Sequence, residues 1–315
     1  MVMIGHNESP LIERRRLGRT GFMVSALGFG ASELGQKRLA LKTVALKTVA
    51  AILGSALDAG LNVIDTAPCY GNSEELLGRV IGNRRKDFYL LTKCGHASGL
   101  PFADWTPALI EASIDRSLRR LSTDYIDIVQ LHSCEEHQLR RGELIYQLRR
   151  ACEKGKLRYL GYSGDGEAAR YAAQCGAFDT VQISVSIADQ DAIDTVLPLL
   201  RQHDIGVIAK RPIANAAWLE GSSWSLGSYS RPYRTRLRKL NYDFLTHDAK
   251  RAVAIALRFT LSVPGVHTAI VGTTRASRWQ RNAVLLAEGP LPQSEYDSIR
   301  ARWRSTASSD WIGLQ

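Results

Sequence analysis

The chain has 315 residues, 45% apolar and 23% charged, and with no long apolar run this composition excludes a membrane-spanning protein. Its net charge of +10 comes with no DNA- or RNA-binding signature, so we interpret its arginine clusters as solvated surface and expect no nucleic-acid or membrane partner. The amino terminus lacks a secretory signal and the five cysteines are scattered, which predicts a cytoplasmic protein without a disulfide framework.

The first predicted element is a small hairpin. Residues 16–30 place glycines at turn positions around short apolar runs, which is typical of a hairpin that leads into a first strand near 24–29. Leu53 and Leu57 then fall on one face of a helix, and Gly60 ends that helix.

The stretch 62–78 combines a buried strand, a polar turn and the start of a helix. Val63 and Ile64 are β-branched and suit a strand covered on both faces, and the carboxylate of Asp65 follows at the strand's carboxyl end. Tyr70 lies in the loop after it. An acid and a phenol placed this close are candidates for proton-transfer chemistry.

Strands and helices alternate along the rest of the chain. Further strands are predicted at 88–93, 125–132, 157–163, 180–184, 205–210 and 268–272. Helices are predicted at 76–81, 110–121, 139–152, 165–175, 190–202, 248–262, 276–287 and 292–305. Eight strands, most followed by a helix, predict an α/β protein that closes as a (β/α)8 TIM barrel, with an N-terminal hairpin and extra C-terminal helices. The rival is an open doubly wound sheet, but no Gly-x-Gly-x-x-Gly follows the first strand.

One segment interrupts the alternation. Residues 211–247 are rich in Ser, Arg, Tyr and Trp without clear periodicity, so we expect a long loop on the active face. Since α/β barrels of this length commonly form one domain, residues 1–315 are predicted to be a single barrel domain.

Four titratable residues are expected to share the barrel mouth. Asp65, Lys93 and His132 stand at the carboxyl ends of the second, third and fourth strands, and Tyr70 lies in the loop after the second. The carboxyl ends of the strands form the functional face of such barrels. Four titratable groups at this face indicate an active site.

The segments around these residues resemble the aldo-keto reductase superfamily. The resemblance covers nearly the whole chain and is carried by Leu17–Gly30, Asp65–Glu74, Leu90–Cys94, Ile126–His132 and Val263–Thr274. It implies an NAD(P)H-dependent carbonyl reductase with a catalytic tetrad of Asp65, Tyr70, Lys93 and His132, acting on a small-molecule carbonyl substrate. Tyr70 would protonate the carbonyl oxygen, Lys93 would lower the pKa of the phenol, Asp65 would hold Lys93, and His132 would orient the carbonyl.

The resemblance also implies where the cofactor binds. The matching residues are Ser163, Gln182, Lys210, Gly272, Thr273, Thr274, Arg278 and Asn282. Ser163 and Gln182 match positions that hold the nicotinamide carboxamide, Arg278 matches the 2′-phosphate position and Asn282 the adenine position. Lys210 and Arg211 are expected to reach the pyrophosphate. The arginine favours NADPH, with NADH possible.

The sequence departs from the family pattern in two places. Many members have Asn after the serine, whereas this chain has Gly164, and residues 184–188 offer no aromatic side chain to stack on the nicotinamide. The first departure puts one contact to the carboxamide in question, and the second requires stacking from another part of the chain.

Several alternatives remain beside the reductase. The same site can run mainly as an NAD(P)+-dependent alcohol or sugar dehydrogenase, or the barrel can be a nucleotide-sensing subunit with little turnover. A metal-dependent hydrolase would need a His-x-His after an early strand, which is absent. A zinc site from Cys69, Cys94, Cys134 and His132 is disfavoured because these cysteines form no local chelating pair, so no metal is predicted. No oligomeric state is predicted.

Overall fold

The computed structural model describes residues 12–35, 45–219 and 230–314. The expectation about the amino-terminal residues, and part of the predicted loop 211–247, lie outside these ranges. No helix in the described part of the chain is long and apolar enough to cross a bilayer.

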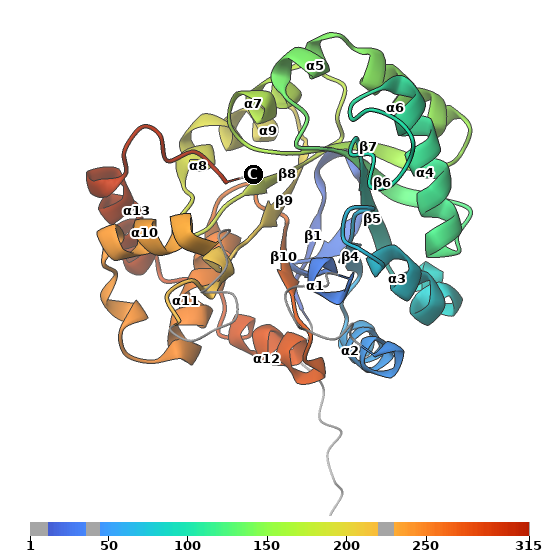
Figure 1. Ribbon diagram of the computed structural model, residues 1–315. Coiled ribbons are helices and arrows are strands. Elements are labelled where there is room, and N and C mark those ends of the chain that lie inside the picture. The colour runs from blue at the N-terminus through green and yellow to red at the C-terminus, as the bar shows by residue number, and fades with distance from the viewer. Residues whose placement is uncertain (1–11, 36–44, 220–229, 315) are drawn as a thin grey trace, which may run out of the picture.

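Eight parallel strands close into a barrel, which confirms the predicted (β/α)8 fold (Figure 1). Around the barrel the order is β10-β3-β4-β5-β6-β7-β8-β9. The strands are β3 Leu27–Gly30, β4 Val63–Asp65, β5 Tyr89–Cys94, β6 Ile126–His132, β7 Leu157–Ser163, β8 Thr180–Ser184, β9 Gly206–Lys210 and β10 Thr268–Gly272. Because every strand runs in the same direction, all their carboxyl ends meet at one rim.

Helices surround the barrel and cover the outer face of its strands (Figure 1). They are α1 Ser32–Gly35, α2 Leu46–Asp58, α3 Ser73–Ile81, α4 Pro107–Leu121, α5 Glu136–Arg140, α6 Glu143–Glu153, α7 Gly166–Gln174, α8 Asp191–Thr195, α9 Leu197–Gln202, α10 Arg231–Leu240, α11 Ala249–Ser262, α12 Ala276–Leu286 and α13 Gln293–Thr306. Their apolar stripes pack on the strands, as the 3.6-residue periodicity predicts.

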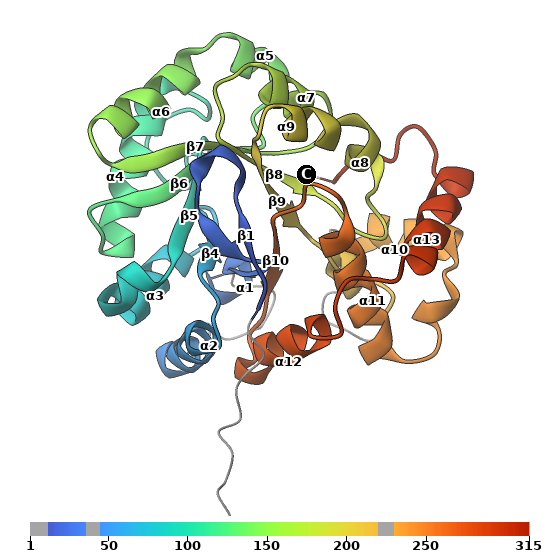
Figure 2. The same cartoon turned by 180° about the vertical axis from the view of Figure 1, so that it is seen from behind.

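The predicted hairpin closes the amino-terminal end of the barrel. Strands β1 (Arg14–Arg16) and β2 (Met23–Ser25) pair antiparallel and lie across that end, as the view from behind shows (Figure 2). Leu17 and Phe22 from the hairpin pack with apolar side chains of the strands, among them Val63. Burying each of the two hairpin side chains contributes about 2 kcal/mol, so the hairpin seals the end opposite the functional rim.

Two predicted helices are each divided in two. The helix expected at 139–152 is split between α5 and α6 at Gly142, which has a left-handed φ of 75° that only glycine adopts readily. The helix expected at 190–202 is split into α8 and α9 next to Pro198, which lacks the N–H that would continue the helical hydrogen bonds.

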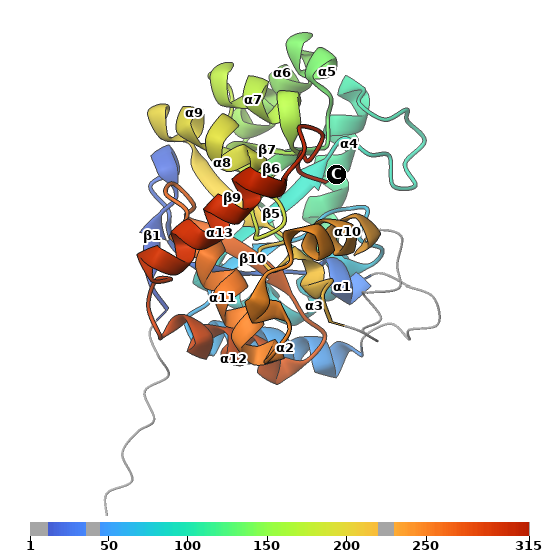
Figure 3. The ribbon, with the colours of Figure 1, turned by 90° about the vertical axis from the view of Figure 1, so that its left-hand side faces the viewer.

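The segment 211–247 contains a helix that the sequence analysis did not predict. Helix α10 buries Tyr233, Leu237 and Leu240, which repeat at the spacing of one helical face. It packs against α13 beside the barrel, as the side view shows (Figure 3). Arginines dominate the rest of α10, and they obscured this short apolar stripe in the sequence.

Candidate active site

A buried ion pair forms the base of the site. Lys93 Nζ lies 2.6 Å from Asp65 Oδ2 and also donates to the carbonyl oxygen of Thr66 at 2.9 Å. Only 1% of the Lys93 side chain is exposed. Burial opposes the lysine's charge, yet the Asp65 carboxylate and the neighbouring Tyr70 hold the pKa of Lys93 above its usual value. The lysine is therefore a fixed ammonium group.

The second oxygen of Asp65 is held by two buried amides. Asp65 Oδ1 accepts from Gln130 Nε2 at 3.1 Å and from Gln182 Nε2 at 3.0 Å. Gln130 was missed in the sequence, although it precedes His132 by two residues and therefore faces the same side of β6. Gln130 could have been found in the sequence as a polar residue two positions before the candidate catalytic histidine on the same strand. These contacts fix the direction of the carboxylate.

Tyr70 lies above the ion pair. Its ring centroid is 5.2 Å from Lys93 Nζ and 6.2 Å from the His132 ring, which it meets edge-on. Burial raises the pKa of Tyr70, and the Lys93 charge lowers it by less than burial raises it. The effect of Lys93 on the phenol has the expected direction, but burial outweighs it, so Tyr70 is a protonated phenol at neutral pH.

His132 is a neutral imidazole at the rim. Burial lowers its pKa well below the usual value, and the cations Lys93 and Lys210 lower it further. Its Nδ1 lies 3.7 Å from the sulfur of Cys69. A neutral imidazole donates from one nitrogen only, so this ring can offer one hydrogen bond to a carbonyl oxygen.

The two predicted carboxamide contacts are adjacent. Ser163 and Gln182 are paired across β7 and β8, and the Ser163 hydroxyl donates to Gln182 Oε1 at 3.0 Å. A hydroxyl and an amide side by side match the donor and acceptor pattern of a carboxamide.

The structure gives a reason for Gly164. A Cβ atom at this position would lie 2.2 Å from the Tyr162 hydroxyl oxygen. That hydroxyl donates to the carbonyl oxygen of Cys134 at 2.9 Å, which fixes its place. An asparagine at this position therefore has no room in this chain.

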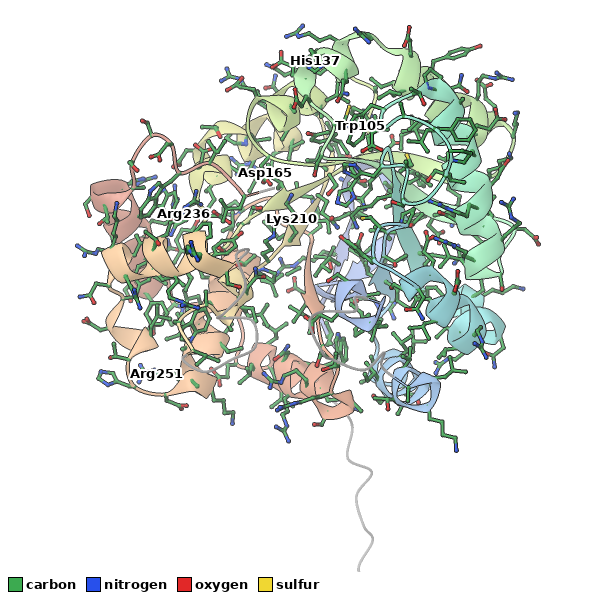
Figure 4. The ribbon with its side chains drawn as sticks, in the orientation of Figure 1. Trp105, His137, Asp165, Lys210, Arg236 and Arg251 are labelled. Carbon is green, nitrogen blue, oxygen red and sulfur yellow. The ribbon has the colours of Figure 1, made fainter. Side chains whose placement is uncertain are left out.

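Lys210 faces a carboxylate at the rim. Lys210 Nζ lies 2.8 Å from Asp165 Oδ2, and the labelled side chains lie close together at the centre of Figure 4. Asp165 also accepts from the backbone N–H of Ser184 at 2.8 Å and from its hydroxyl at 3.1 Å. Burial lowers the pKa of Lys210, and Asp165 opposes that shift. A phosphate ligand would therefore compete with Asp165 for this lysine.

The predicted adenosine segment lies between β10 and α12. The Thr273 hydroxyl accepts from the backbone N–H of Arg275 at 3.0 Å, which shapes the turn into α12. Arg278 and Asn282 follow at positions i and i+4 and share a helix face. A helix amino terminus next to an arginine suits a phosphate, so these residues fit the adenosine part of a dinucleotide. Thr274 is exposed at the same turn.

Metal-binding side chains do not gather in the described residues. Within residues 12–35, 45–219 and 230–314, no three His, Cys, Asp or Glu side chains are placed to hold a metal ion. All five cysteines are free, with Cys94 and Cys134 buried and Cys69 exposed.

Comparisons with known proteins point to one family. The model of the aldo/keto reductase family matches residues 26–304. L-galactose dehydrogenase of Arabidopsis thaliana is 30% identical over 296 residues, which cover 88% of this chain and 89% of that protein. An uncharacterized oxidoreductase of Bacillus subtilis, YqkF, is 29% identical over 317 residues, covering 92% and 96%.

A solved structure has the same fold. The holo form of aldo-keto reductase AKR11C1 from Bacillus halodurans superposes with a TM-score of 0.78 at 25% sequence identity. The match covers 95% of this chain and 99% of that chain. The similarity therefore includes the whole barrel and its rim.

Proposed function

Because this chain belongs to the aldo/keto reductase family, we propose that it reduces an aldehyde or ketone to an alcohol with NADPH as cofactor. The observation that carries the proposal is the convergence of Asp65, Tyr70, Lys93 and His132, from three strands and a loop, at one rim of the barrel. Bound NADPH would supply hydride to the carbonyl carbon.

The side chains have complementary roles in this proposal. As charge develops on the carbonyl oxygen, Tyr70 donates its phenolic proton to that oxygen. The Lys93 ammonium stabilises the phenolate that remains, and Asp65 keeps the ammonium aimed and charged. The neutral His132 ring donates one hydrogen bond that positions the carbonyl.

The cofactor would lie across the carboxyl ends of four strands. Ser163 and Gln182 would hold the carboxamide, Lys210 would reach the pyrophosphate, and the turn from Gly272 into α12 would take the adenosine phosphate. Arg278 on α12 supports the choice of NADPH over NADH, since a guanidinium pairs well with a phosphate.

Replacing the phenol tests the proton donor. Tyr70→Phe removes the proton and keeps the ring, so we expect kcat to fall by about 10²- to 10⁴-fold while the affinity for NADPH, measured by fluorescence titration, stays unchanged. Tyr146→Phe is the matched control, because Tyr146 is an exposed tyrosine on α6. A Tyr70→Phe enzyme with near full turnover would show that another group donates the proton.

A second candidate is an NAD(P)+-dependent dehydrogenase on the same site. It is favoured by the similarity to a protein named L-galactose dehydrogenase. Measuring kcat/KM for aldehyde reduction and for alcohol oxidation at one pH separates the two. Tight NADPH binding without turnover of any aldehyde or alcohol would instead favour a nucleotide-sensing subunit.

A further inference from the structure

The loop that connects β5 to α4 is closed on itself beside the active site. The backbone N–H of Trp105 donates to the carbonyl oxygen of Gly95 at 2.9 Å. Gly95 has a φ of 120°, and a Cβ atom there would lie 1.9 Å from the Trp105 ring. Trp105, labelled in Figure 4, therefore packs directly on the glycine backbone and locks the two ends of the loop together.

The interior of this loop is held by a buried arginine. Arg116 on α4 donates to the carbonyl oxygens of Ser98 at 2.9 Å and Ala97 at 3.3 Å. Only 8% of Arg116 is exposed. The loop backbone is thereby fixed to the barrel wall.

His96 is the side chain that this loop positions. Its Nδ1 lies 2.9 Å from Asp104 Oδ2, and the other carboxylate oxygen accepts from the Ala97 N–H at 2.8 Å. The His96 ring also packs edge-on against Trp105, with 4.7 Å between centroids. Two contacts therefore set the orientation of this imidazole, and the Ala97 N–H fixes the carboxylate that makes one of them.

His96 is oriented beside the catalytic histidine. The ring centroids of His96 and His132 are 5.4 Å apart at an interplanar angle of 74°. The His96 side chain is 37% exposed, and among the described residues its Nε2 makes no hydrogen bond. One imidazole nitrogen is thus bound to a carboxylate, and the other remains for a ligand at the mouth.

We propose that His96, held by Asp104, binds a hydroxyl group on the carbon next to the substrate carbonyl and makes the enzyme selective for α-hydroxy aldehydes and ketones. This inference rests on the proposed reductase function. The two oxygens of such a substrate are neighbours, so one can bond to His132 while the other bonds to His96 Nε2. An imidazole nitrogen can donate to or accept from a hydroxyl, whichever its protonation state requires.

The charges at the mouth favour a neutral hydroxyl over a carboxylate. Lys93 is paired with Asp65, Lys210 with Asp165, and His96 with Asp104. A substrate carboxylate beside His96 would lie close to the Asp104 carboxylate, which repels it. A site built to bond a hydroxyl rejects the analogue that lacks it, because its polar group is then left unpaired.

The test compares two aldehydes that differ by one hydroxyl, lactaldehyde and propanal, both with saturating NADPH. We expect the native enzyme to favour lactaldehyde by about 10- to 100-fold in kcat/KM. His96→Leu should bring this ratio close to one, mainly through KM for lactaldehyde, while kcat/KM for propanal changes less than about threefold. Asp104→Asn should give a lactaldehyde-to-propanal ratio between those of the native enzyme and His96→Leu, because residue 104 still bonds to His96 but no longer carries a charge.

His137→Leu is the matched control, since His137 on α5, labelled at the top of Figure 4, is an exposed histidine that also contacts a carboxylate, at 3.2 Å. A lactaldehyde preference that survives His96→Leu, or an equal loss for both aldehydes, would overturn the inference. So would a native preference for glyoxylate over lactaldehyde. If the native enzyme reduces both aldehydes equally well, the proposed contact between His96 and the hydroxyl is wrong and the reductase function stands. If it reduces neither aldehyde, the proposed reductase function is contradicted as well.

Discussion

The sulfur of Cys69 lies 3.7 Å from Nδ1 of His132. Partial desolvation by the surrounding residues raises the pKa of the Cys69 thiol, and burial lowers that of His132, so both groups are neutral at pH 7. We predict that the thiol donates its proton to Nδ1, which places the ring proton on Nε2. In that tautomer Nε2 can donate to a substrate carbonyl.

This relationship predicts a specific effect of replacing Cys69. Cys69→Ala should lower kcat/KM about fivefold, as expected for a hydrogen bond worth about 1 kcal/mol, and Cys69→Ser should restore it. Nitrogen-15 NMR of the His132 ring reports the tautomer directly. Equal populations of the two tautomers in the native enzyme would contradict the assignment, even if the alanine variant were slow.

The buried pair of Lys93 and Asp65 predicts that stability and activity can be separated. Lys93→Met leaves a buried carboxylate without its cation, so we expect the free energy of unfolding to fall by about 3 to 5 kcal/mol and turnover to be lost. The double variant Lys93→Met/Asp65→Asn removes both charges and keeps an oxygen that accepts from Gln130 and Gln182, so it should recover part of the stability and none of the activity. Urea unfolding followed by circular dichroism measures the first effect. Equal instability of the single and double variants would show that the loss comes from packing.

The sequence could predict the strands and their polar ends because both follow from local pattern. A buried strand that ends in a titratable residue is visible at Asp65, Lys93 and His132 without knowledge of the partners. The position of α10 was not predicted, since its stripe of Tyr233, Leu237 and Leu240 is short and embedded among arginines.

Properties that depend on packing could not be predicted from the chain. The pKa of Tyr70 depends on how much burial outweighs the charge of Lys93, and burial is a result of the folded barrel. The absence of a side chain at residue 164 is explained only by the hydroxyl of Tyr162, which the sequence does not place. The His96–Asp104 contact likewise requires a loop whose ends meet.

Replacing Arg278 should change the preference of the protein for NADPH over NADH. If Arg278 pairs with the 2′-phosphate as proposed, Arg278→Gln removes a charge-assisted contact, so we expect Kd for NADPH to rise about tenfold while Kd for NADH changes little. Arg281→Gln is the control, because Arg281 is an exposed arginine on the same helix. Fluorescence titration of both cofactors measures the ratio. A parallel change for NADPH and NADH would place the 2′-phosphate elsewhere.

His267 predicts how stability depends on pH. Its Nδ1 accepts a hydrogen bond from the backbone N–H of Val207 at 2.9 Å, so protonation of that nitrogen would break the bond between β9 and the start of β10. Burial and the charge of Arg15 lower the pKa of His267. Below about pH 6.5 the unfolded chain therefore binds a proton that the native state does not.

The stability that His267 supplies is present above the unfolded pKa and is lost as the pH falls below it. We expect native protein to lose more stability between pH 7.5 and 5.5 than the His267→Gln variant, by about 1 kcal/mol, since one group contributes at most about 1.4 kcal/mol per pH unit. Urea unfolding of both proteins at each pH gives this difference, in which the other titrating groups cancel. If the free energy of unfolding changes with pH in the same way for both proteins, the pKa of His267 is the same in the folded and unfolded states and the prediction is wrong.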